Sequence, residues 1–234
     1  MASKVLIVGG TSGIGRELAA AYAERDASVV IAGRESARAE KVAAELNADS
    51  EGARVSGIAV DLASPDTIVE ALSGIGQVDS VVLAGMRRDD NTVGNYGTAG
   101  ATELVIAKLV GYTAVVHALQ SRISPTGSVL LFGGLAKDLP YPGSTTVTTV
   151  NAGVMGLVST LSREIAPVRV NAIHPGLVGD SPYWAGNELV LEPARKRILT
   201  GVLPTMRDIV EGCFFLLENQ AANGVNLNLN GGHS

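Results

Sequence analysis

The sequence is poor in several kinds of side chain, and each shortage excludes a class of protein. Cys213 is the only cysteine among 234 residues, so no internal disulfide can form. Charged residues make up 18%, the net charge is -5 and no basic cluster stands out, so we do not expect nucleic acid as a partner. No uninterrupted apolar run approaches the roughly 18 residues of a membrane span, and the first residues do not resemble a signal peptide. We therefore expect a cytoplasmic protein with no membrane partner.

Apolar residues make up 46% of the chain and aromatic residues only 4%, so small aliphatic residues carry most of the apolar content. Short apolar runs alternate with longer segments of helical periodicity. The runs that we predict to be strands are 4–10, 28–33, 54–60, 79–85, 128–134, 168–176 and 225–232. This alternation indicates parallel strands joined by helices, and strands that are apolar throughout indicate a sheet covered on both faces. The sequence therefore predicts one α/β domain over residues 1–234, a three-layer, doubly wound fold with seven parallel strands.

Two polar segments interrupt the alternation, and each follows the carboxyl end of a predicted strand. Residues 86–100 are rich in glycine and charge, whereas 177–204 form a longer stretch with prolines and aromatics. Ligands of such sheets bind beyond the carboxyl ends of the strands. We therefore predict that both segments line a pocket for a small-molecule substrate, with 177–204 as a lid.

A glycine-rich turn, GGTSGIG, lies between the first predicted strand and an amphipathic helix. Glycine permits a tight turn and lets backbone N–H groups approach a pyrophosphate at the start of the helix. We predict that a dinucleotide binds here; the alternative is a packing turn that binds nothing. The residues of the turn that we expect at the dinucleotide are Gly9, Thr11, Ser12, Gly13, Ile14 and Gly15.

The residue after the second predicted strand favours one dinucleotide over the other. An NAD site of this type has an acidic residue here that binds the ribose 2′-hydroxyl. This chain has Arg34 instead, and a guanidinium pairs well with a 2′-phosphate. We therefore predict NADP(H) as the cofactor; the alternative is that Arg34 is a solvated residue at the start of a helix.

Taken together, these segments resemble the short-chain dehydrogenase/reductase family over the entire chain. GGTSGIG is similar to that family's cofactor loop, VDLAS to the end of its third strand, VRVNAIHPGLV to its sixth strand and NLNLNGG to its closing strand. VVLAG keeps only the last two residues of the family's Asn-Asn-Ala-Gly strand. The resemblance implies a Rossmann-type fold and further cofactor contacts at Asp61, Leu62, Ala84, Gly85, Pro175, Gly176 and Leu177.

The same resemblance points to an atypical active site. Members of the family use a Tyr and a Lys four residues apart, a Ser thirteen residues before the Tyr, and an Asn on the preceding long helix. The run NAGVMGLVSTL aligns with the family's Lys-Ala-Gly segment, which places Val147, Asn151, Gly134 and Lys108 at the Tyr, Lys, Ser and Asn positions. No Tyr-x-x-x-Lys occurs anywhere in the sequence. We therefore predict that the usual proton donor is absent.

The catalytic candidates that remain are Lys108, Tyr141 and Asn151, and we expect no metal site. Lys108 and Asn151 look like an exchange of the family's Lys and Asn, so we predict that Lys108 restores a positive charge in the pocket; the alternative is a surface lysine. Asn151 would hydrogen-bond the nicotinamide ribose, together with Ser144 and Thr148 on the same helical face. Tyr141 would swing in from a loop, or simply pack there.

Three functions fit this pattern. The first is an NADPH-dependent reductase whose acceptor needs no tyrosine, such as an iminium ion or a conjugated or quinone-like compound. The second is a non-redox cyclase, isomerase or dehydratase, and the third is a non-catalytic NADP(H)-binding protein. We also expect a homo-tetramer or homo-dimer, because the predicted helices 101–123 and 145–166 carry long apolar faces with small residues.

Overall fold

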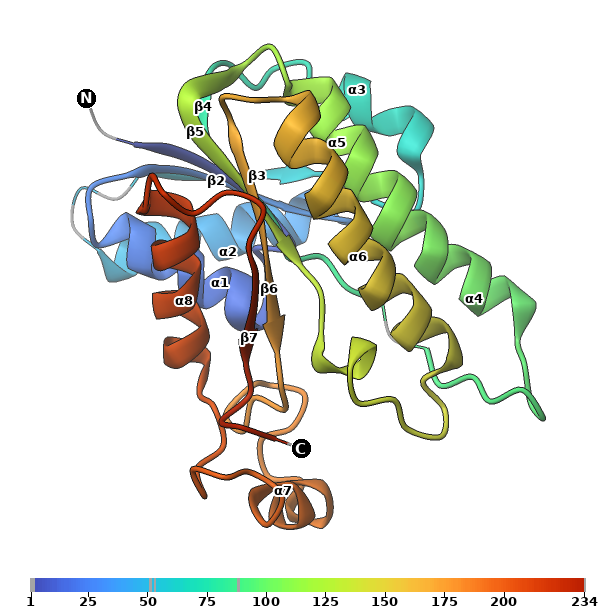
Figure 1. Ribbon diagram of the computed structural model, residues 1–234. Helices are drawn as coiled ribbons and strands as arrows, with labels where there is room; N and C mark the ends of the chain where they lie inside the picture. The colour runs from blue at the N-terminus through green and yellow to red at the C-terminus, as the bar shows by residue number, and fades with distance from the viewer. Residues whose placement is uncertain (1–2, 51, 53, 88, 234) are drawn as a thin grey trace.

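The computed structural model describes residues 3–50, 52, 54–87 and 89–233. Its strands are β1 (Lys4–Val8), β2 (Ser28–Gly33), β3 (Arg54–Ala59), β4 (Val78–Leu83), β5 (Ile123–Phe132), β6 (Arg169–Pro175) and β7 (Asn226–Leu229). They form one seven-stranded sheet in the order β3-β2-β1-β4-β5-β6-β7, and every neighbouring pair is parallel. The predicted doubly wound α/β fold is therefore confirmed (Figure 1).

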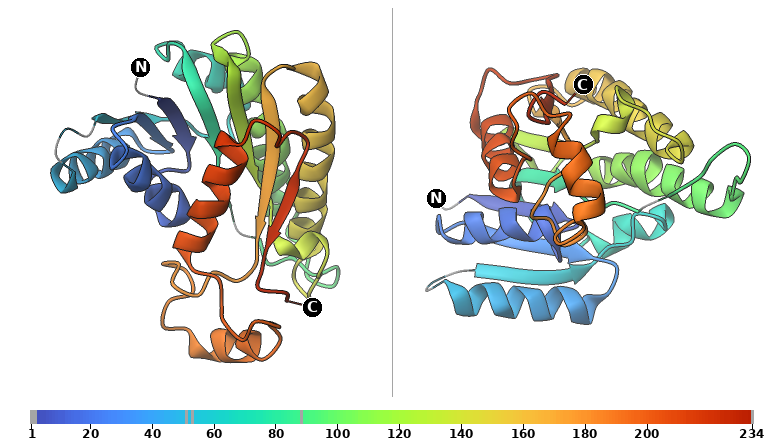
Figure 2. Two further views of the ribbon diagram at one scale, coloured as in Figure 1. Left: turned by 60° about the vertical axis from the view of Figure 1, so that its left-hand side comes forward. Right: turned by 90° about the horizontal axis from the view of Figure 1, so that it is seen from below.

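Helices cover both faces of this sheet. The α-helices are α1 (Gly13–Ala23), α2 (Ser36–Asp49), α3 (Ile68–Ala71), α4 (Thr98–Val105), α5 (Gly111–Leu119), α6 (Thr145–Glu164), α7 (Glu188–Arg195) and α8 (Met206–Glu218). Two short 3-10 helices, η1 (Pro65–Thr67) and η3 (Leu135–Lys137), and a π-helical turn, η2 (Ile106–Val110), complete the set. Helices α1, α2 and α8 pack on one face, and α3, α5 and α6 pack on the other (Figure 2).

The hydrophobic core consists of two layers, one on each face of the sheet. Side chains alternate along a strand, so Val5 and Ile7 of β1 contribute to the layer under α1 and α8, whereas Leu6 and Val8 contribute to the opposite layer. All four are at most 2% exposed. This is why the strands read as continuous apolar runs rather than as alternating ones.

Several element boundaries differ from the sequence predictions for local reasons. Strand β1 ends at Val8 rather than at residue 10, because Gly9 turns the chain with a positive φ of 91°. Strand β5 begins at Ile123, five residues before the predicted start at 128. The segment 177–204 contains α7, which we did not predict, and it projects from the body of the molecule below the sheet in Figure 1.

One continuous helical stretch, Thr98–Leu119, is long and apolar enough by length and composition to cross a membrane. It spans α4, η2 and α5. Its buried residues, among them Ala107, Tyr112 and Leu119, pack into the core layer between this helix and the sheet. The stretch is therefore placed as a core helix of the fold.

Candidate active site

The turn after β1 requires glycine at Gly9. Its φ is 91°, in the region that L side chains rarely adopt, and its backbone N–H donates to the Ala32 carbonyl of β2 at 2.8 Å. A Cβ at this position would lie 2.4 Å from the Gly85 nitrogen at the end of β4. The turn is thus held tightly between the ends of β2 and β4, at the centre of the sheet.

The rest of the turn forms a cradle that fits a pyrophosphate. A Cβ on Gly15 would lie 2.3 Å from the Gly9 carbonyl oxygen, so α1 starts directly against the turn. At Gly13, with φ 52°, a Cβ would meet only Pro182 Cδ at 4.0 Å, so the space in front of the turn is open. The first backbone N–H groups of a helix have no intrahelical acceptor and favour an anion. The predicted turn residues, with Thr11, Ser12 and Ile14, therefore lie where a dinucleotide would bind.

Arg34 lies beside this cradle, immediately after β2. The preceding residue, Gly33, contacts the turn, since a Cβ there would be 2.8 Å from Thr11 Cγ2. The Arg34 side chain is exposed, and it makes no ion pair with any other described residue. Its guanidinium is therefore available to a ligand on the turn.

Asp61 and Leu62 follow β3, on the other side of the turn from α1. The Asp61 carboxylate accepts hydrogen bonds from the Ala63 backbone at 3.1 Å and from the Ser64 hydroxyl at 3.3 Å. It lines an open hollow of about 410 Å³ together with residues of α4 and η2, including Ile106. Leu62 reaches the end of β4, because a Cβ on Gly85 would be 2.7 Å from Leu62 Cδ1.

Ala84 and Gly85, which we predicted as the last residues of a strand, lie directly beyond the end of β4, and the Ala84 N–H donates to the Val8 carbonyl at 2.8 Å. At the end of β6, the Gly176 N–H donates to the Leu229 carbonyl at 2.9 Å, which fixes the turn between Pro175 and Leu177 next to β7. All the predicted cofactor residues are thus brought to the carboxyl edge of the sheet.

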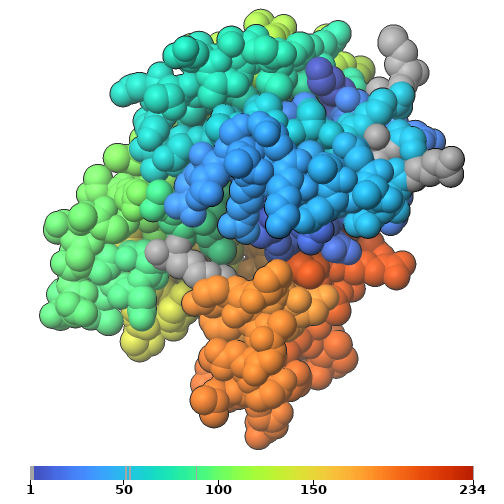
Figure 3. Space-filling model, turned by 180° about the vertical axis from the view of Figure 1, so that it is seen from behind, coloured from blue at the N-terminus to red at the C-terminus, as the bar shows by residue number. Residues whose placement is uncertain are grey.

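The segment after that turn forms a small unit of its own. Leu177 and Trp184 pack against a cluster of buried residues from α7 and the following loop, Leu191, Ala194, Ile198 and Leu203. In the space-filling view this orange segment projects away from the blue and cyan part of the molecule (Figure 3). Asp180 accepts a hydrogen bond from the Met206 N–H at 2.8 Å, so its carboxylate holds the start of α8.

The reaction end of the site lies between β5, η3 and α6. Gly134 follows β5, and a Cβ there would be 2.7 Å from Asn151 Nδ2, so the two positions are in contact. Asn151 is 5% exposed, and its side-chain amide has no hydrogen-bond partner among the residues that the structure describes. Val147, one turn earlier on α6, is half-buried. These three side chains offer no acid or base.

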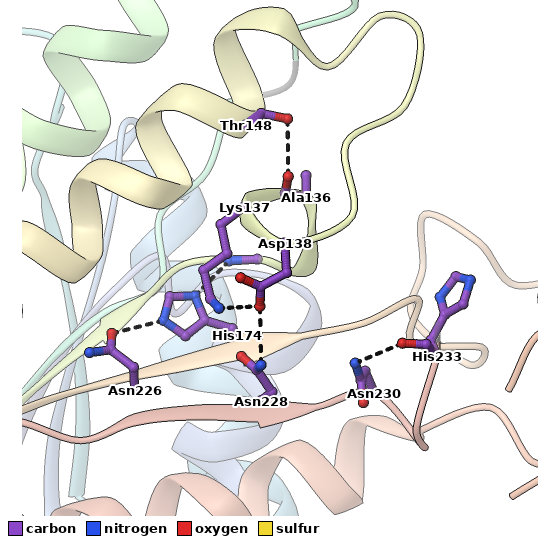
Figure 4. Close-up of polar contacts among 10 residues, drawn as sticks. Ala136, Lys137, Asp138, Thr148, His174, Asn226, Asn228, Asn230 and His233 are labelled. Atoms are coloured by element: carbon purple, nitrogen blue, oxygen red, sulfur yellow. Dashed lines mark hydrogen bonds and ion pairs between the residues drawn. The ribbon is translucent and has the colours of Figure 1, made fainter. Parts of the chain in front are cut away.

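The predicted polar face of α6 is used differently from what we expected. The Ser144 hydroxyl accepts from the Tyr141 N–H at 2.9 Å and donates to the Tyr141 carbonyl at 2.7 Å. The Thr148 hydroxyl donates to the Ala136 carbonyl at 3.1 Å (Figure 4). Both hydroxyls therefore tie the loop after β5 to α6, and Asn151 is the member of this face whose polar atoms are uncommitted.

Tyr141 lies on the rim of the site rather than inside it. Its side chain is 55% exposed, and its backbone is held by Ser144. A role in proton transfer would require this loop to move, so it stays a prediction.

Lys108 is buried, which decides against the surface alternative. The residue is 2% exposed, and its Nζ has no hydrogen-bond partner within the described part of the chain. It lies on the π-helical turn η2, a distortion that occurs often at functional sites. Burial lowers the pKa of Lys108 to about 7, because desolvation disfavours the ammonium form.

Two basic residues near this end were not among the predicted site residues. His174 on β6 is fully buried; its Nδ1 accepts from the Gly134 N–H at 3.2 Å and its Nε2 is 3.0 Å from Asn226 Oδ1. Lys137, whose side chain is 4% exposed, pairs with Asp138 (Figure 4). Desolvation lowers the pKa of His174 to about 4, so it is neutral at physiological pH. Lys137 could have been identified from the sequence as a candidate, because it lies just beyond the carboxyl end of the predicted strand 128–134.

Known proteins match this chain along most of its length. The family model described as short chain dehydrogenase matches residues 3–187. The human dehydrogenase/reductase SDR family member 2, mitochondrial, is 30% identical over 80% of this chain and 70% of its own length. The short-chain dehydrogenase/reductase ucsE of Acremonium sp is 28% identical over 97% of this chain and 94% of its own. The structure of the MalC Reductase/Diels-Alderase from Malbranchea aurantiaca superposes with a TM-score of 0.90 at 26% identity, covering 99% of this chain and 95% of that one.

Proposed function

This chain belongs to the short-chain dehydrogenase family, and on that premise we propose that it is an atypical NADPH-dependent reductase of a small organic substrate. Proteins of this family bind a nicotinamide dinucleotide. The turn at Gly9, Gly13 and Gly15 fits the pyrophosphate of that cofactor, since added Cβ atoms would close the turn while the space in front of Gly13 is open. NADPH, when bound, would supply a hydride.

The observation that carries the NADPH preference is the exposed Arg34 guanidinium beside the cradle. No carboxylate pairs with it in the portion of the chain that is described. A 2′-phosphate would give it a charge-assisted pair that NADH lacks. Asp61 would lie toward the adenine, Asn151 would bind the nicotinamide ribose, and Pro175, Gly176 and Leu177 would flank the nicotinamide.

The reaction end supports an acceptor that does not depend on a tyrosine. Hydride transfer to a ketone leaves an alkoxide that needs a proton. Val147, Gly134 and Asn151 do not provide one, so we propose that the family's Ser, Tyr, Lys and Asn are replaced here. Suitable acceptors are an iminium ion, which becomes a neutral amine, or a conjugated or quinone-like compound, which delocalises the charge.

A second candidate function is a non-redox cyclisation. It is favoured by the likeness to a protein that is described both as a reductase and as a Diels-Alderase. In such a reaction the pocket acts through orientation, and the bound cofactor would be part of the pocket wall. A non-catalytic NADP(H)-binding protein is the third alternative.

The test combines nucleotide binding with substrate turnover. NADPH and NADH are titrated by calorimetry, and NADPH oxidation is then followed by absorbance with cyclohexanone, cyclohex-2-enone, a benzoquinone and a cyclic iminium ion. Acceptor-dependent oxidation, with tighter binding of NADPH than of NADH, is the expected result. Product formation at constant absorbance would favour the cyclase, and binding without any turnover would favour the non-catalytic alternative.

We also propose self-association through the helices α4, α5 and α6. An apolar hollow of about 650 Å³ lies on the outer face of η2, α5 and α6, lined by Leu109, Val110, Thr113, Ala114, His117 and Leu157. A second copy would cover it. Light scattering should give a dimeric or tetrameric mass, and a monomeric mass at micromolar concentration would contradict the proposal.

A further inference from the structure

Lys108 places a long basic side chain at the carboxyl ends of the central strands. One helical turn later, the Tyr112 hydroxyl donates to the Gly85 carbonyl at 3.0 Å and lies 3.5 Å from the Phe132 carbonyl. Lys108 Nζ is 5.2 Å from the centre of the Tyr112 ring. The helix runs antiparallel to the strands, so Lys108 lies nearer than Tyr112 to the edge where ligands bind.

The electrostatic effect of Lys108 on His174 also supports this placement. The charge of Lys108 contributes to the lowered pKa of His174, so Nζ lies within electrostatic reach of the end of β6 as well as of β4 and β5. The other charged group there, Lys137, is paired with Asp138. Among the described residues, no carboxylate is bonded to Lys108.

Asn151 is a second polar residue at the same edge, and it is 5% exposed. It contacts Gly134 at the end of β5, and its amide makes no hydrogen bond to another described residue. A buried polar group without a partner is destabilising, and more so when it is charged. The buried Lys108 Nζ without a partner, together with the Asn151 amide that bonds no other described residue, indicates that a polar ligand completes this region.

We propose that Lys108 binds the oxygen of a neutral carbonyl substrate and donates its proton to that oxygen as the substrate is reduced. This inference rests on the proposed reductase function and narrows the substrate class: because Lys108 would supply the proton, it keeps the conjugated acceptors, adds simple ketones and excludes iminium ions. Lys108 would thus take the place of the family's tyrosine, from a different helix and with a different acidic group.

The step balances without a further reactant. The carbonyl carbon of a ketone, or the β-carbon of a conjugated ketone, receives the hydride and forms a C–H bond. The π electrons move to the oxygen, where an alkoxide or enolate forms. The Lys108 ammonium gives up one N–H proton to this oxygen, and the neutral amine regains a proton from water. The products are the reduced substrate and NADP⁺.

The charge of Lys108 also discriminates between the acceptors. A preformed iminium cation would meet a like charge with no nearby carboxylate to offset it, whereas an oxygen that gains negative charge would be stabilised. Burial brings the pKa of Lys108 to about 7, so its ammonium is a stronger acid than that of an ordinary lysine and is still populated at neutral pH. The inference therefore selects ketones and conjugated ketones over iminium ions.

Two ligands of opposite charge test this without turnover. The protein with saturating NADP⁺ is titrated with 4-nitrophenolate, a mimic of the oxyanion, and with N-methylpyridinium, a mimic of the iminium ion. We expect Lys108→Met to bind 4-nitrophenolate about 10- to 100-fold more weakly, and to bind N-methylpyridinium at least as tightly as the wild type. Lys108→Gln serves as a second variant, and Lys196→Met, at a position whose side chain is 74% exposed, is the matched control.

Equal affinity for 4-nitrophenolate in the wild type and in both Lys108 variants would overturn the inference. So would a wild-type protein that holds NADP⁺ but takes up no phenolate. NADP⁺ binding is measured in the same samples, and the phenolate titration is repeated without nucleotide. Uptake of phenolate that depends on Lys108, in a protein without affinity for NADP⁺, would contradict the proposed reductase function and leave the oxyanion site standing.

Discussion

The two ends of the proposed site are built by different means. At the cofactor end, backbone atoms form the turn: Gly9 and Gly13 have positive φ, and Gly15 lies too close to the Gly9 carbonyl for any side chain. At the reaction end, side chains decide what can happen, and there the chain has Asn151, Gly134 and Val147 beside a buried Lys108.

The difference gives a physical reason for our proposal that the cofactor end follows the family and the reaction end does not. A backbone cradle tolerates little change, because a Cβ added at Gly9 or Gly15 would meet backbone atoms within 3 Å and Gly13 has a positive φ of 52°. Side chains at the strand ends can be exchanged without disturbing the sheet. We therefore propose that the chain keeps the family's nucleotide-binding turn and uses a different proton donor.

The strongest disruption of the cofactor end is Gly15→Ala. Its Cβ would lie 2.3 Å from the Gly9 carbonyl oxygen, so α1 must move away from the turn. We expect a loss of about 3 kcal/mol in the free energy of unfolding and a roughly 100-fold loss of NADPH affinity, because the backbone donors no longer converge. Urea denaturation and calorimetry measure these. Gly156→Ala is the control, since its Cβ meets nothing within 4 Å; a similar loss there would refute the explanation.

At the reaction end, the buried Lys108 predicts an unusual pH dependence of stability. Its folded pKa is about 7, against an ordinary value of 10.5, so between these values the unfolded chain binds more protons and stability rises with pH. From pH 7 to pH 9 the rise should be about 2–3 kcal/mol. His174 titrates mainly below this window. Cys213 ionises near the upper end of the window in the unfolded chain only, because burial raises its pKa in the folded protein, and this opposes the rise by about 0.5–1 kcal/mol at pH 9.

The check on this prediction is urea denaturation of the wild type and of Lys108→Met across that window. The variant should be more stable at pH 7, and its stability should fall slightly with pH instead of rising, because the Cys213 contribution remains. A wild-type profile without the rise, parallel to that of the variant, would mean that Lys108 is solvated in solution.

A smaller effect is expected from Arg34→Ala, which sharpens the comparison within the cofactor end. Loss of one charge-assisted pair should weaken NADPH binding roughly 10- to 30-fold and leave NADH binding unchanged. Arg207→Ala, at a position whose side chain is 85% exposed on α8, is the control. If NADH and NADPH lose affinity equally in Arg34→Ala, the residue does not recognise the 2′-phosphate.

The smallest effect is expected from Tyr141→Phe. The side chain is 55% exposed, and the loop is held through backbone bonds to Ser144, which the substitution keeps. The rate of NADPH oxidation should change by less than about twofold. A loss of several-fold or more would make Tyr141 a proton donor and would weaken the case for Lys108.

The fold and the glycine turn after β1 were predictable because local patterns encode them. Apolar runs marked the strands, and glycine spacing marked the turn. Helix α7 was missed, since it is short and contains Pro193. The burial of Lys108 was predicted only as one of two alternatives, because it depends on how the helix faces the sheet. The bonds of Ser144 and Thr148 depend on the loop after β5, whose path the sequence does not reveal.

The central claim is that this chain binds a phosphorylated dinucleotide at the cofactor end of the site and uses Lys108 in place of a tyrosine at the reaction end. A crystal structure of the complex with NADPH and cyclohex-2-enone tests it most directly. The account predicts the pyrophosphate on the turn at Gly13, the 2′-phosphate at Arg34, and Lys108 Nζ within about 3.2 Å of the ketone oxygen. Nucleotide bound elsewhere, or a tyrosine brought to the ketone oxygen in place of Lys108, would contradict it.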